Sequence, residues 1–411
     1  MQKQSVSNRD FVGGTSLGTR VLHVVTRLNA GGVTHQILTV TEQLRKLGYD
    51  VQIAAGRCGR REVDCSRDII ERGVQVCKLS HLSNAAGPVG DLLAFLELYR
   101  LFRNTRPSLV HLHMFKARVL GSLAAWLAGI PVIIETLHGN ILEGYYNKLA
   151  TAIILFAERI VGWMLAQCVI AVSEGPRAEL IRYGVAPARK IKVVRYGFDF
   201  DRLLNLAPFR GQLKAELNIP SGVVVVGIVS RLVPIKGLDD FLKAADHVVK
   251  SNGKIPIHVV IAGDGELREE LEGYCKGVGI ERVCRFLGWR DDIEKIYADI
   301  DVFVMSSLNE GSPVSLIEAM AAGKAIVSTG VGGIPDMLED GVSAFLVPPK
   351  EPQALAAAIL RLVSEGDTRE RLGKEAQVRA LQDYSIPSLV CQIEGLYQAL
   401  LSSHGIKAGQ R

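Results

Sequence analysis

The chain has 411 residues, of which 48% are hydrophobic and 22% are charged. This is the composition of a soluble globular protein, and the length allows two domains of about 200 residues each. Seven cysteines are scattered without a CxxC pair, so we expect reduced thiols and exclude a zinc site.

The charge is unevenly distributed. Residues 1–205 carry 26 Lys and Arg against 16 Asp and Glu, whereas residues 206–411 carry 22 against 27. A basic first half favours an anionic partner such as a membrane surface or a phosphate-bearing lipid, although a scattered basic surface without a partner would give the same numbers. Nucleic acid is disfavoured because the cations are dispersed and aromatic residues are few. The polar start predicts no secretory signal, and the longest uncharged run, 119–134, is interrupted by glycines and a proline and predicts no membrane span.

The first half alternates strands with helices. Residues 1–19 are predicted to be a flexible tail, followed by a strand over 20–26, a glycine pair at Gly31 and Gly32, and a helix ending near residue 47. Glycines between a strand and a helix let the backbone approach a ligand, or simply make a tight turn. The remaining elements are predicted as strands over 49–55, 109–113, 131–136 and 169–173, with helices over 91–103, up to 128 and over 148–166.

Histidines mark two of these strands. His111 and His113 share one face of their strand, a spacing that could bind a metal. No third ligand is evident from the sequence, so we predict no metal site there. His138 follows a strand and precedes a glycine, where open α/β sheets bind ligands. A ligand-binding role for His138 is favoured over a structural one.

The second half restarts the pattern with a buried strand over 223–230. Arg231 and Lys236 follow it, and two cations five residues apart suit a diphosphate, although exposed loop cations are common. The next strand, 257–262, ends in Gly263-Asp264-Gly265, which is not the GxGxxG dinucleotide fingerprint. Further strands are predicted over 284–288 and 325–329, and helices over 292–298, 352–364, 368–381 and 386–401.

The stretch from Glu310 to Glu318 lies between a predicted strand, 300–307, and a short helix that ends at Gly323. Ser312 is the predicted N-cap and Pro313 the first helical residue, so the following amides point outward and form an anion site. A carboxylate on each side of that site suits the hydroxyls of a sugar and of a ribose flanking a diphosphate. The alternative is that both are ordinary solvated carboxylates.

Two halves of alternating strands and helices predict an α/β protein of two doubly wound parallel-sheet (Rossmann-like) domains, 20–205 and 206–384, facing a cleft.

Taken together, these motifs resemble the retaining glycosyltransferases of the GT-B fold, family 4 type, from residue 20 onward. The segment 138–174 is most similar to members that build cell-surface polysaccharides. The matching pieces are Asn29-Ala30-Gly31-Gly32, Val110-His111-Leu112-His113, His138-Gly139, Ala171-Val172-Ser173-Glu174, Gly197-Phe198-Asp199, Ser230-Arg231-Leu232 with Lys236-Gly237, Gly263-Asp264-Gly265, Tyr297-Ala298-Asp299-Ile300-Asp301-Val302 and the Glu310–Glu318 stretch.

The resemblance implies a first domain on the acceptor side, a second domain that binds the donor, and a C-terminal helix, 385–411, that packs back on the first domain. It implies a role for each of the following residues: Glu310 at the hydroxyls of the donor sugar, Glu318 at the ribose, Arg231 and Lys236 at the diphosphate, Gly311, Ser312, Pro313, Ser315 and Leu316 around the anion site, Arg290 at the base, Gly31 and Gly32 at the phosphates from the other domain, His138 near the reacting sugar, and His113 on the acceptor side. Many relatives have Gly-Gly-x-Glu where this chain has Gly31-Gly32-Val33-Thr34, so a carboxylate that could position the acceptor is missing.

The implied activity is transfer of a hexosyl unit, with retention, from a UDP- or GDP-linked sugar to a saccharide or polyprenyl-linked saccharide. We expect no cofactor and no metal, and we interpret Asp199-Phe200-Asp201 and Asp299-Ile300-Asp301 as decoys. The expected location is the cytoplasm, with peripheral association at the inner face of the membrane. The alternatives are a sugar-nucleotide epimerase on the same fold, a non-catalytic nucleotide-sugar-binding protein and, last, a nicotinamide-dependent oxidoreductase.

Overall fold

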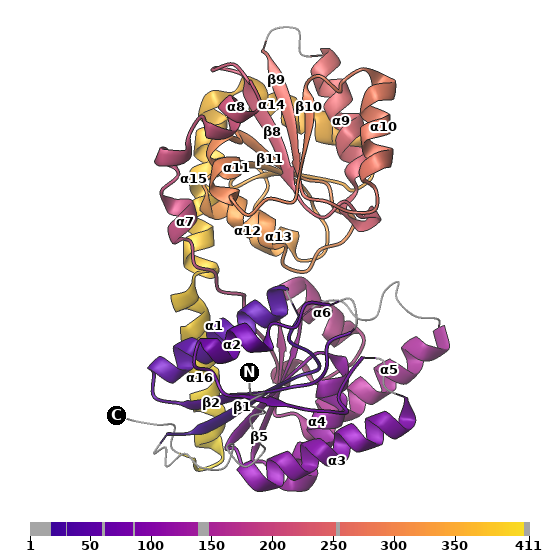
Figure 1. Ribbon diagram of the computed structural model, residues 1–411, viewed down its shortest axis with the longest axis vertical. Helices are drawn as coiled ribbons and strands as arrows, with labels where there is room; N and C mark the ends of the chain where they lie inside the picture. The colour runs from indigo at the N-terminus through magenta and orange to yellow at the C-terminus, as the bar shows by residue number, and fades with distance from the viewer. Residues whose placement is uncertain are drawn as a thin grey trace, which may run out of the picture. The chain divides into compact units, whose positions relative to one another are not determined.

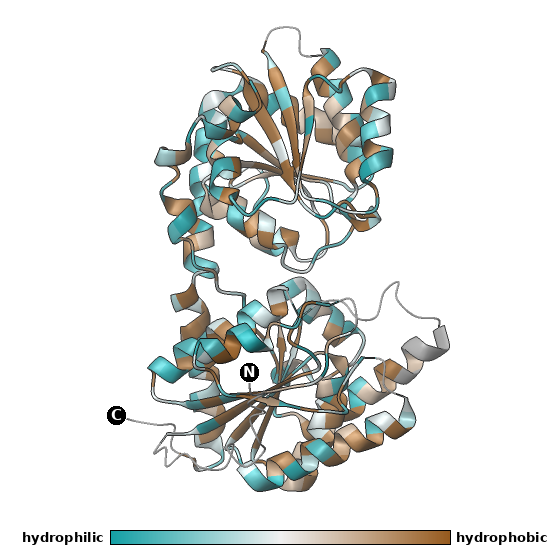
Figure 2. Cartoon of the chain, viewed as in Figure 1, coloured by the Kyte–Doolittle hydropathy of each residue, from teal (hydrophilic) through white to brown (hydrophobic). Residues whose placement is uncertain are grey.

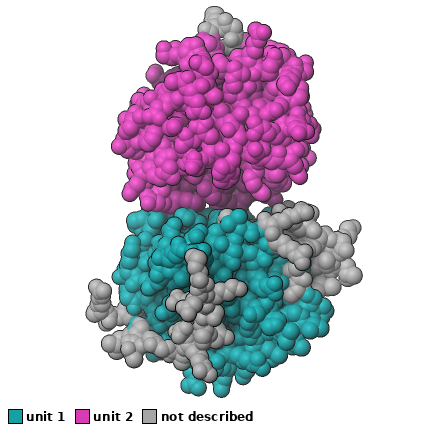
Figure 3. Space-filling model, in the orientation of Figure 1, with its two compact units in different colours: residues 1–197, 386–411 teal, residues 198–385 magenta. Residues whose placement is uncertain are grey.

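The computed structural model describes residues 18–29, 31–59, 62–84, 87–138, 148–251 and 255–406, without the side chains of residues 148–151 and 153. The chain forms two compact units, which Figure 3 distinguishes by colour. Unit 1 comprises residues 1–197 and 386–411, and unit 2 comprises residues 198–385.

Unit 1 is built on a parallel sheet of seven strands in the order β3-β2-β1-β4-β5-β6-β7 (Figure 1). The order reverses between β1 and β4, which is the switch point at which open α/β sheets bind ligands. The strands are β1 (Arg20–Val25), β2 (Asp50–Ala55), β3 (Val76–Lys78), β4 (Leu109–His113), β5 (Val132–Leu137), β6 (Cys168–Ala171) and β7 (Ile191–Val193).

Helices cover both faces of this sheet, so alternate strand residues enter different cores. Leu22 and Val24 face the helices α3 and α4, whereas Val21 faces α1 and α16. Both faces are apolar, which explains the near-continuous hydrophobic strands that Figure 2 shows in brown. The helices of unit 1 are α1 (Gly32–Lys46), α2 (Ser66–Glu71), α3 (Pro88–Thr105), α4 (Phe115–Ala128), α5 (Lys148–Ile160) with a π-helical turn (Val161–Leu165), α6 (Glu174–Arg182) and α16 (Ile386–Ser403).

The C-terminal helix α16 belongs to unit 1, as predicted. Leu389, Ile393, Tyr397 and Leu401 recur every four residues and form one buried stripe. Each buried aliphatic side chain of this kind contributes about 1.5–3 kcal/mol. The stripe packs on the same core as Val21, so the last helix completes a sheet face that the first strand began.

Unit 2 repeats the strand order in a parallel sheet of six strands, β10-β9-β8-β11-β12-β13, with its switch point between β8 and β11. Both sheets therefore have the predicted doubly wound topology. The strands are β8 (Val224–Val229), β9 (Ile257–Ala262), β10 (Cys284–Gly288), β11 (Val302–Met305), β12 (Ala325–Thr329) and β13 (Phe345–Val347).

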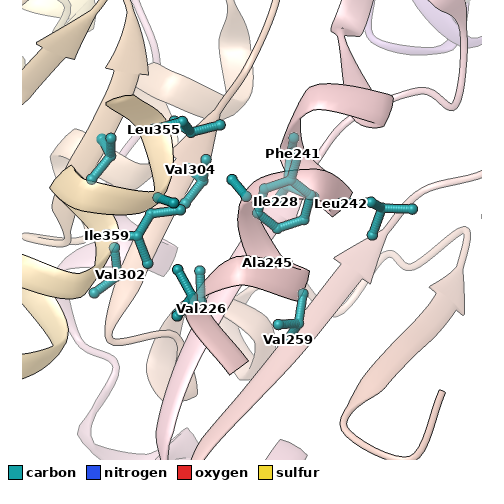
Figure 4. Close-up of a cluster of buried hydrophobic side chains, with 14 of the residues drawn as sticks. Val226, Ile228, Phe241, Leu242, Ala245, Val259, Val302, Val304, Leu355 and Ile359 are labelled. Carbon is teal, nitrogen blue, oxygen red and sulfur yellow. The ribbon is translucent and has the colours of Figure 1, made fainter. Parts of the chain in front are cut away.

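Two cores sandwich the sheet of unit 2. On one face, Val226 and Ile228 pack against Phe241 of α9 and Ile359 of α14 (Figure 4). On the other face, Val225 shares a core with residues of α11, α12 and α15. The helices of unit 2 are α7 (Asp201–Leu204), α8 (Gln212–Glu216), α9 (Leu238–Ser251), α10 (Arg268–Val278), α11 (Ile293–Asp299), α12 (Val314–Ala321), α13 (Ile334–Met337), α14 (Pro352–Ser364) and α15 (Gly366–Asp383).

The chain passes into unit 2 after Gly197, eight residues before the predicted boundary between 205 and 206. Phe200 and Leu203 lie in a core of unit 2, and the amide of Phe198 donates to the carbonyl of Tyr384 at 2.8 Å. These contacts assign residues 198–205 to unit 2. The prolines at 208 and 220 did not indicate this boundary. Most of the predicted tail, residues 1–17, lies outside the described residues.

Candidate active site

A cavity of about 520 Å³ opens at the carboxyl ends of the strands of unit 2. It lies beside the switch point, because β8 and β9 end in it and the helix that follows β11 begins in it. Its lining residues are Val229, Ser230, Arg231, Lys236, Ala262, Gly263, Asp264, Trp289, Arg290, Asp291, Ile293, Ile296, Pro313, Val314, Ser315 and Glu318.

The loop carrying Arg231 is fixed to the end of β9. The amide of Ser230 donates to Ala262, and the amide of Leu232 donates to the carbonyl of Asp264. Gly263 has φ +132°, and a Cβ there would lie 1.9 Å from the carbonyl oxygen of Ser230, so this position requires glycine. Gly263 and its neighbours thus shape the loop, while the guanidinium of Arg231 is exposed at the cavity.

Lys236 and Glu310 meet in an ion pair. Lys236 ends a short 3₁₀ turn, and its Nζ lies 2.5 Å from Oε1 of Glu310. The hydroxyl of Ser307 donates to the same oxygen at 2.6 Å. The side chain of Glu310 is only 9% exposed, and within the described part of the chain no hydrogen bond reaches its Oε2. Lys236 therefore lines the cavity and at the same time forms an ion pair with Glu310.

The helix α12 starts one residue later than predicted. Pro313, not Ser312, is the N-cap, and its carbonyl accepts the first helical hydrogen bond, from Ile317. The hydroxyl of Ser312 is buried and caps nothing. Because Pro313 has no side-chain oxygen either, the first amides of α12 have no capping side chain, and Val314 and Ser315 face the cavity. The positive end of the helix dipole is thus directed at the cavity, as predicted. Gly323 follows the helix with φ +66°.

Glu318 lies one turn into α12 and lines the cavity. The hydroxyl oxygen of Tyr297 lies 3.0 Å from its Oε2 and 2.9 Å from the carbonyl oxygen of Ser315, and its one hydrogen can donate to either acceptor. Burial disfavours the charged carboxylate and raises the pKa of Glu318 to about 7, against the opposing effects of the Tyr297 hydrogen bond and the Arg202 charge. Glu318 can therefore change its protonation near neutral pH.

Trp289 and Arg290, which follow β10, also line the cavity. The guanidinium of Arg290 is held by Glu216 and Asp292 through four hydrogen bonds of 2.5–3.0 Å. Its charge is thus neutralised by two carboxylates, which leaves the plane of the group and the backbone for contact with a ligand. The neighbouring indole of Trp289 is 80% exposed and lines the cavity. An exposed tryptophan in a cavity is a surface on which a nucleobase can stack.

In unit 1, Gly31 and Gly32 start helix α1 at the switch point of the sheet. Gly31 has the extended φ of 172°, and a Cβ at either position would meet nothing within 4 Å among the described atoms. Neither position is forced to be glycine by the described fold. Their predicted approach to a donor phosphate stays a prediction, and Gly139, after His138, lies outside the described residues.

His113 and His138 lie next to each other at the carboxyl edge of the same sheet. His113 Nδ1 is 3.0 Å from His138 Nε2, and His138 Nδ1 is 3.0 Å from the hydroxyl of Tyr196. Burial lowers the pKa of His138 to about 3 and that of His113 well below its ordinary value. Both imidazoles are therefore neutral, and both nitrogens of His138 already have hydrogen-bond partners.

A third histidine, His23 of β1, joins His111 and His113 in a group whose ligand atoms lie within 4.8 Å of one another. The sequence offered no third ligand, and the pairing of β1 with β4 supplies one. The nitrogens of His111 are both hydrogen-bonded to hydroxyls, of Tyr397 and Thr136 at 2.6 Å each. These bonds explain the group as a hydrogen-bond network of neutral imidazoles.

The two Asp-x-Asp triplets have structural partners. Asp299 accepts from the amides of Gly211 and Lys214 and so caps the start of α8, while Asp301 accepts from the amide of Val225. The amide of Asp201 donates to Asp199. These bonds fit the interpretation of the triplets as decoys.

Most of the predicted donor-site residues gather in unit 2: Arg231, Lys236, Arg290, Pro313, Ser315 and Glu318 line the cavity, and Glu310 joins it through Lys236. Leu316 is fully buried and does not line the cavity, and Gly311 and Ser312 form the turn before α12 without lining the cavity. Sequence reasoning missed Trp289, Tyr297 and Ser307. A tryptophan directly after a strand was a usable signal, but nothing local marked the hydroxyls of Tyr297 and Ser307.

Comparison with known proteins finds relatives over most of the chain. Residues 30–202 match the family model described as Glycosyltransferase Family 4, and residues 209–379 match the one described as Glycosyl transferases group 1. The chain is 26% identical over 381 residues to UDP-Gal:alpha-D-GlcNAc-diphosphoundecaprenol alpha-1,3-galactosyltransferase of Escherichia coli, covering 92% of this chain and 96% of that protein. It is 23% identical to the capsular polysaccharide biosynthesis glycosyltransferase CapM of Staphylococcus aureus, covering 88% and 92%.

Solved structures share the fold. Anabaena HepE in complex with UDP superimposes with a TM-score of 0.80 at 22% identity, covering 93% of this chain and all of that one. Sucrose-phosphate synthase from Thermosynechococcus elongatus gives a TM-score of 0.73 at 20% identity, covering 94% and 100%. Two Rossmann-like sheets and a cavity at the second switch point define a GT-B fold enzyme. The chain belongs to the family 4 type of glycosyltransferases, as the two family models show.

Proposed function

We propose that this glycosyltransferase moves a hexosyl unit from a UDP-linked sugar to a saccharide or lipid-linked saccharide acceptor in cell-surface polysaccharide synthesis, with retention and without a metal ion. The cavity of unit 2 carries the proposal, because three cations, an uncapped helix start, three carboxylates and an exposed indole surround one space. The cations are Arg231, Lys236 and Arg290, and the carboxylates are Asp264, Asp291 and Glu318. The galactosyltransferase of E. coli named above uses UDP-galactose and a diphosphoundecaprenol-linked acceptor, and HepE binds UDP, which supports this choice of donor and acceptor class.

The donor fits the cavity in one direction. Trp289 stacks on the uracil, and Glu318 accepts hydrogen bonds from the ribose hydroxyls. Arg231, Lys236 and the first amides of α12 surround the diphosphate, and the Oε2 of Glu310 accepts from a hydroxyl of the sugar. Apart from Glu310, which joins the cavity through Lys236, these groups lie at the end of β10, in the loop after β8 and at the start of α12, which all border the cavity.

The positive groups assist the chemical step. As the bond between the anomeric carbon and the phosphate oxygen breaks, negative charge develops on the departing UDP, and preorganised cations and amides stabilise it. The acceptor oxygen attacks the same face, and its proton moves to the departing phosphate oxygen, so the new bond keeps the configuration of the old one. Lys236 is already placed by Glu310 at 2.5 Å, which reduces the reorganisation that this step requires.

A lipid-linked acceptor is supported by an apolar surface of α3–α5 on unit 1. Helix α3 packs on α4, and α4 packs on the π-helical turn after α5. Two exposed tryptophans, Trp126 and Trp163, lie on this surface, and such side chains partition to the membrane–water interface. The exposed apolar side chains of these helices are Val89, Leu92, Leu93, Leu96, Leu123, Trp126, Leu127, Phe156, Ile160, Trp163 and Met164, of which Leu93 and Leu96 also border a cavity with Glu97 and Arg100.

Charge favours the same partner. The first half of the chain is basic, and anionic lipids attract Lys and Arg near the surface with about 1 kcal/mol each. Among the described helices, none has the length and apolarity needed to cross a bilayer. We therefore propose peripheral binding to an anionic lipid surface at the cytoplasmic face.

Incubation with nucleotide sugars tests the function. A thermal-shift panel of UDP-glucose, UDP-galactose, UDP-N-acetylglucosamine and GDP-mannose identifies the donor, because a ligand bound to the native state raises the melting temperature. The stabilising donor is then followed by NMR during its slow hydrolysis. Retention predicts that the α-anomer of the free sugar is released first from the α-linked donor. Release of the β-anomer would contradict retention, and an epimerised nucleotide sugar would identify an epimerase instead.

A further inference from the structure

Three histidines of unit 1 form a continuous hydrogen-bonded chain. His23 Nδ1 lies 2.9 Å from His113 Nε2, and His113 Nδ1 lies 3.0 Å from His138 Nε2. The chain ends at Tyr196, whose hydroxyl lies 3.0 Å from His138 Nδ1. Each hydrogen bond therefore joins Nδ1 of one histidine either to Nε2 of the next histidine or, at the end, to the hydroxyl of Tyr196.

This chain of histidines runs diagonally across β1, β4 and the end of β5. In the register of the sheet, His23 is paired with His111, which lies two residues before His113. His113 is in turn paired with Thr136, which lies two residues before His138. Residues two apart on a strand share a face, so the three rings lie on the face that α1 and α16 cover. The chain thus connects the buried interior of unit 1 to the carboxyl edge of its sheet.

Hydrogen bonding makes the three rings share one tautomer. Burial keeps them neutral, and a neutral imidazole has one N–H and one lone pair. In each bond between two rings, one nitrogen donates and the other accepts. If His23 donates from Nδ1, then His113 and His138 must also carry Nδ1–H; if His23 accepts there, all three carry Nε2–H.

The two ends of the chain choose between these arrangements. His23 Nε2 is buried and has no hydrogen-bond partner among the described residues. A proton on that atom would be a buried N–H without an acceptor, which is rarer and costlier than an unpaired lone pair. At the other end, an Nδ1–H on His138 can donate to the oxygen of Tyr196, because the hydroxyl of Tyr196 can itself donate to another acceptor, such as the carbonyl of His138 at 3.4 Å. The Nδ1–H arrangement is therefore favoured.

We propose that His23 is a positioning residue for His138: through His113 it fixes the proton and the ring orientation of His138 at the ligand-binding edge of unit 1. His23 itself is 1% exposed and cannot touch a substrate. Its effect on catalysis rests on the proposed glycosyl transfer, whereas the shared tautomer does not.

Nitrogen-15 NMR of histidine-labelled protein tests the chain directly, because the two ring nitrogens of a neutral imidazole have distinct shifts when protonated or not. We expect His23, His113 and His138 to carry Nδ1–H together. Different tautomers among the three rings, an Nε2–H on any of them, or a metal ion bound to His23 and His113 in the purified protein would overturn the proposal.

Two substitutions of single hydroxyls sharpen the test. Tyr196→Phe removes the acceptor for the Nδ1–H of His138, so we expect Nε2–H to become populated at all three rings, including the distant His23. Tyr397→Phe is the matched control, because Tyr397 bonds to His111 and lies outside the chain; only the His111 signals should change. A response to Tyr196→Phe confined to His138 contradicts the chain.

Enzyme kinetics test the functional part. His23→Leu removes the donor that fixes His113, so we expect mixed tautomers at His138 and roughly a tenfold fall in kcat, the scale of one lost hydrogen bond. The donor KM should stay unchanged, because the donor cavity lies in unit 2. His247→Leu, at an exposed histidine of α9, is the control. A single tautomer at His138 with unchanged kcat in His23→Leu overturns the positioning role. A wild-type protein without transferase activity would instead refute the proposed function and leave the NMR result standing.

Discussion

The two units share one strand order, but the side chains at the carboxyl edge of their sheets differ in charge. Unit 2 presents Arg231, Lys236 and an uncapped helix start around a cavity of about 520 Å³. Unit 1 presents neutral histidines, bonded to one another and to tyrosine, beside a cavity of about 30 Å³. The topology decides where a ligand binds, and the side chains decide which charge it carries. An anion suits unit 2, while neutral hydroxyl-bearing partners suit unit 1.

Removing a cation from unit 2 should have the largest effect. Lys236→Ala is expected to lower turnover roughly a hundredfold or more, because one group that stabilises the charge on the leaving UDP is lost. Arg231→Ala should act on the same scale. Lys243→Ala, a half-exposed lysine of α9, is the control and should keep normal turnover. Normal turnover in either cavity variant would refute the diphosphate contact.

Trp289 tests the base end of the cavity. Trp289→Ala should weaken UDP binding roughly tenfold to hundredfold, since stacking of a base on an aromatic ring contributes about 1–3 kcal/mol. Turnover at saturating donor should change little, because the indole lies away from the reacting carbon. Calorimetric titration with UDP measures the effect, with Trp126→Ala as control. Equal UDP affinity in the Trp289 variant and the wild type would place the base elsewhere.

Glu318 should make donor binding depend on pH. Burial raises the pKa of this carboxyl to about 7, and the ribose hydroxyls require the deprotonated form as acceptor. Donor affinity should therefore be full above pH 7 and fall as the pH drops below 7, by up to tenfold per pH unit. Burial raises the pKa of Tyr297, whose hydroxyl faces Glu318, well above its ordinary value, so Tyr297 stays protonated over this range.

A nucleotide sugar rather than UDP is the ligand for this experiment, because its diphosphate has no ionisation near neutral pH. Glu318→Gln should bind weakly at every pH and lose the dependence. If the variant keeps the pH profile of the wild type, the titrating group is not Glu318.

The smallest expected effect concerns the apolar surface of α3–α5. Trp163→Ser should weaken binding to vesicles that contain anionic lipid several-fold, because it removes a large interfacial side chain. Trp289→Ser changes a still more exposed tryptophan, which lies in unit 2, and should bind vesicles like the wild type. Sedimentation with vesicles at two salt concentrations measures both. Equal binding of the two variants would argue against docking through unit 1.

Much of unit 2 could be predicted from the sequence, because its site is made of local signals. Two short patterns indicate the site from a few residues each. One is a β-branched strand followed by Arg231 and Lys236, and the other is a turn with Pro313 between two carboxylates. The error at Ser312 has a simple cause: proline can serve as N-cap with φ −70° as well as first helical residue. The hydroxyls of Tyr297 on Glu318 and of Ser307 on Glu310 could not be predicted, because no local pattern marks them.

The network of unit 1 could not be predicted, because it depends on contacts between distant strands. His23 and His113 are ninety residues apart, and Tyr397 reaches His111 across 286 residues. The sequence showed His111 and His113 on one face but could not show which strand lay beside them. The same limit explains the boundary error at residue 205, since the packing of Phe200 on unit 2 has no local marker.

Calorimetric titration of UDP into the wild-type protein and into Arg231→Ala is the decisive experiment for the donor cavity. We expect binding of one UDP per chain to the wild type and at least tenfold weaker binding to the variant, because the exposed side chain of Arg231 is lost from the cavity. Equal affinity of the two proteins for UDP would contradict the assignment of the unit 2 cavity as the donor site.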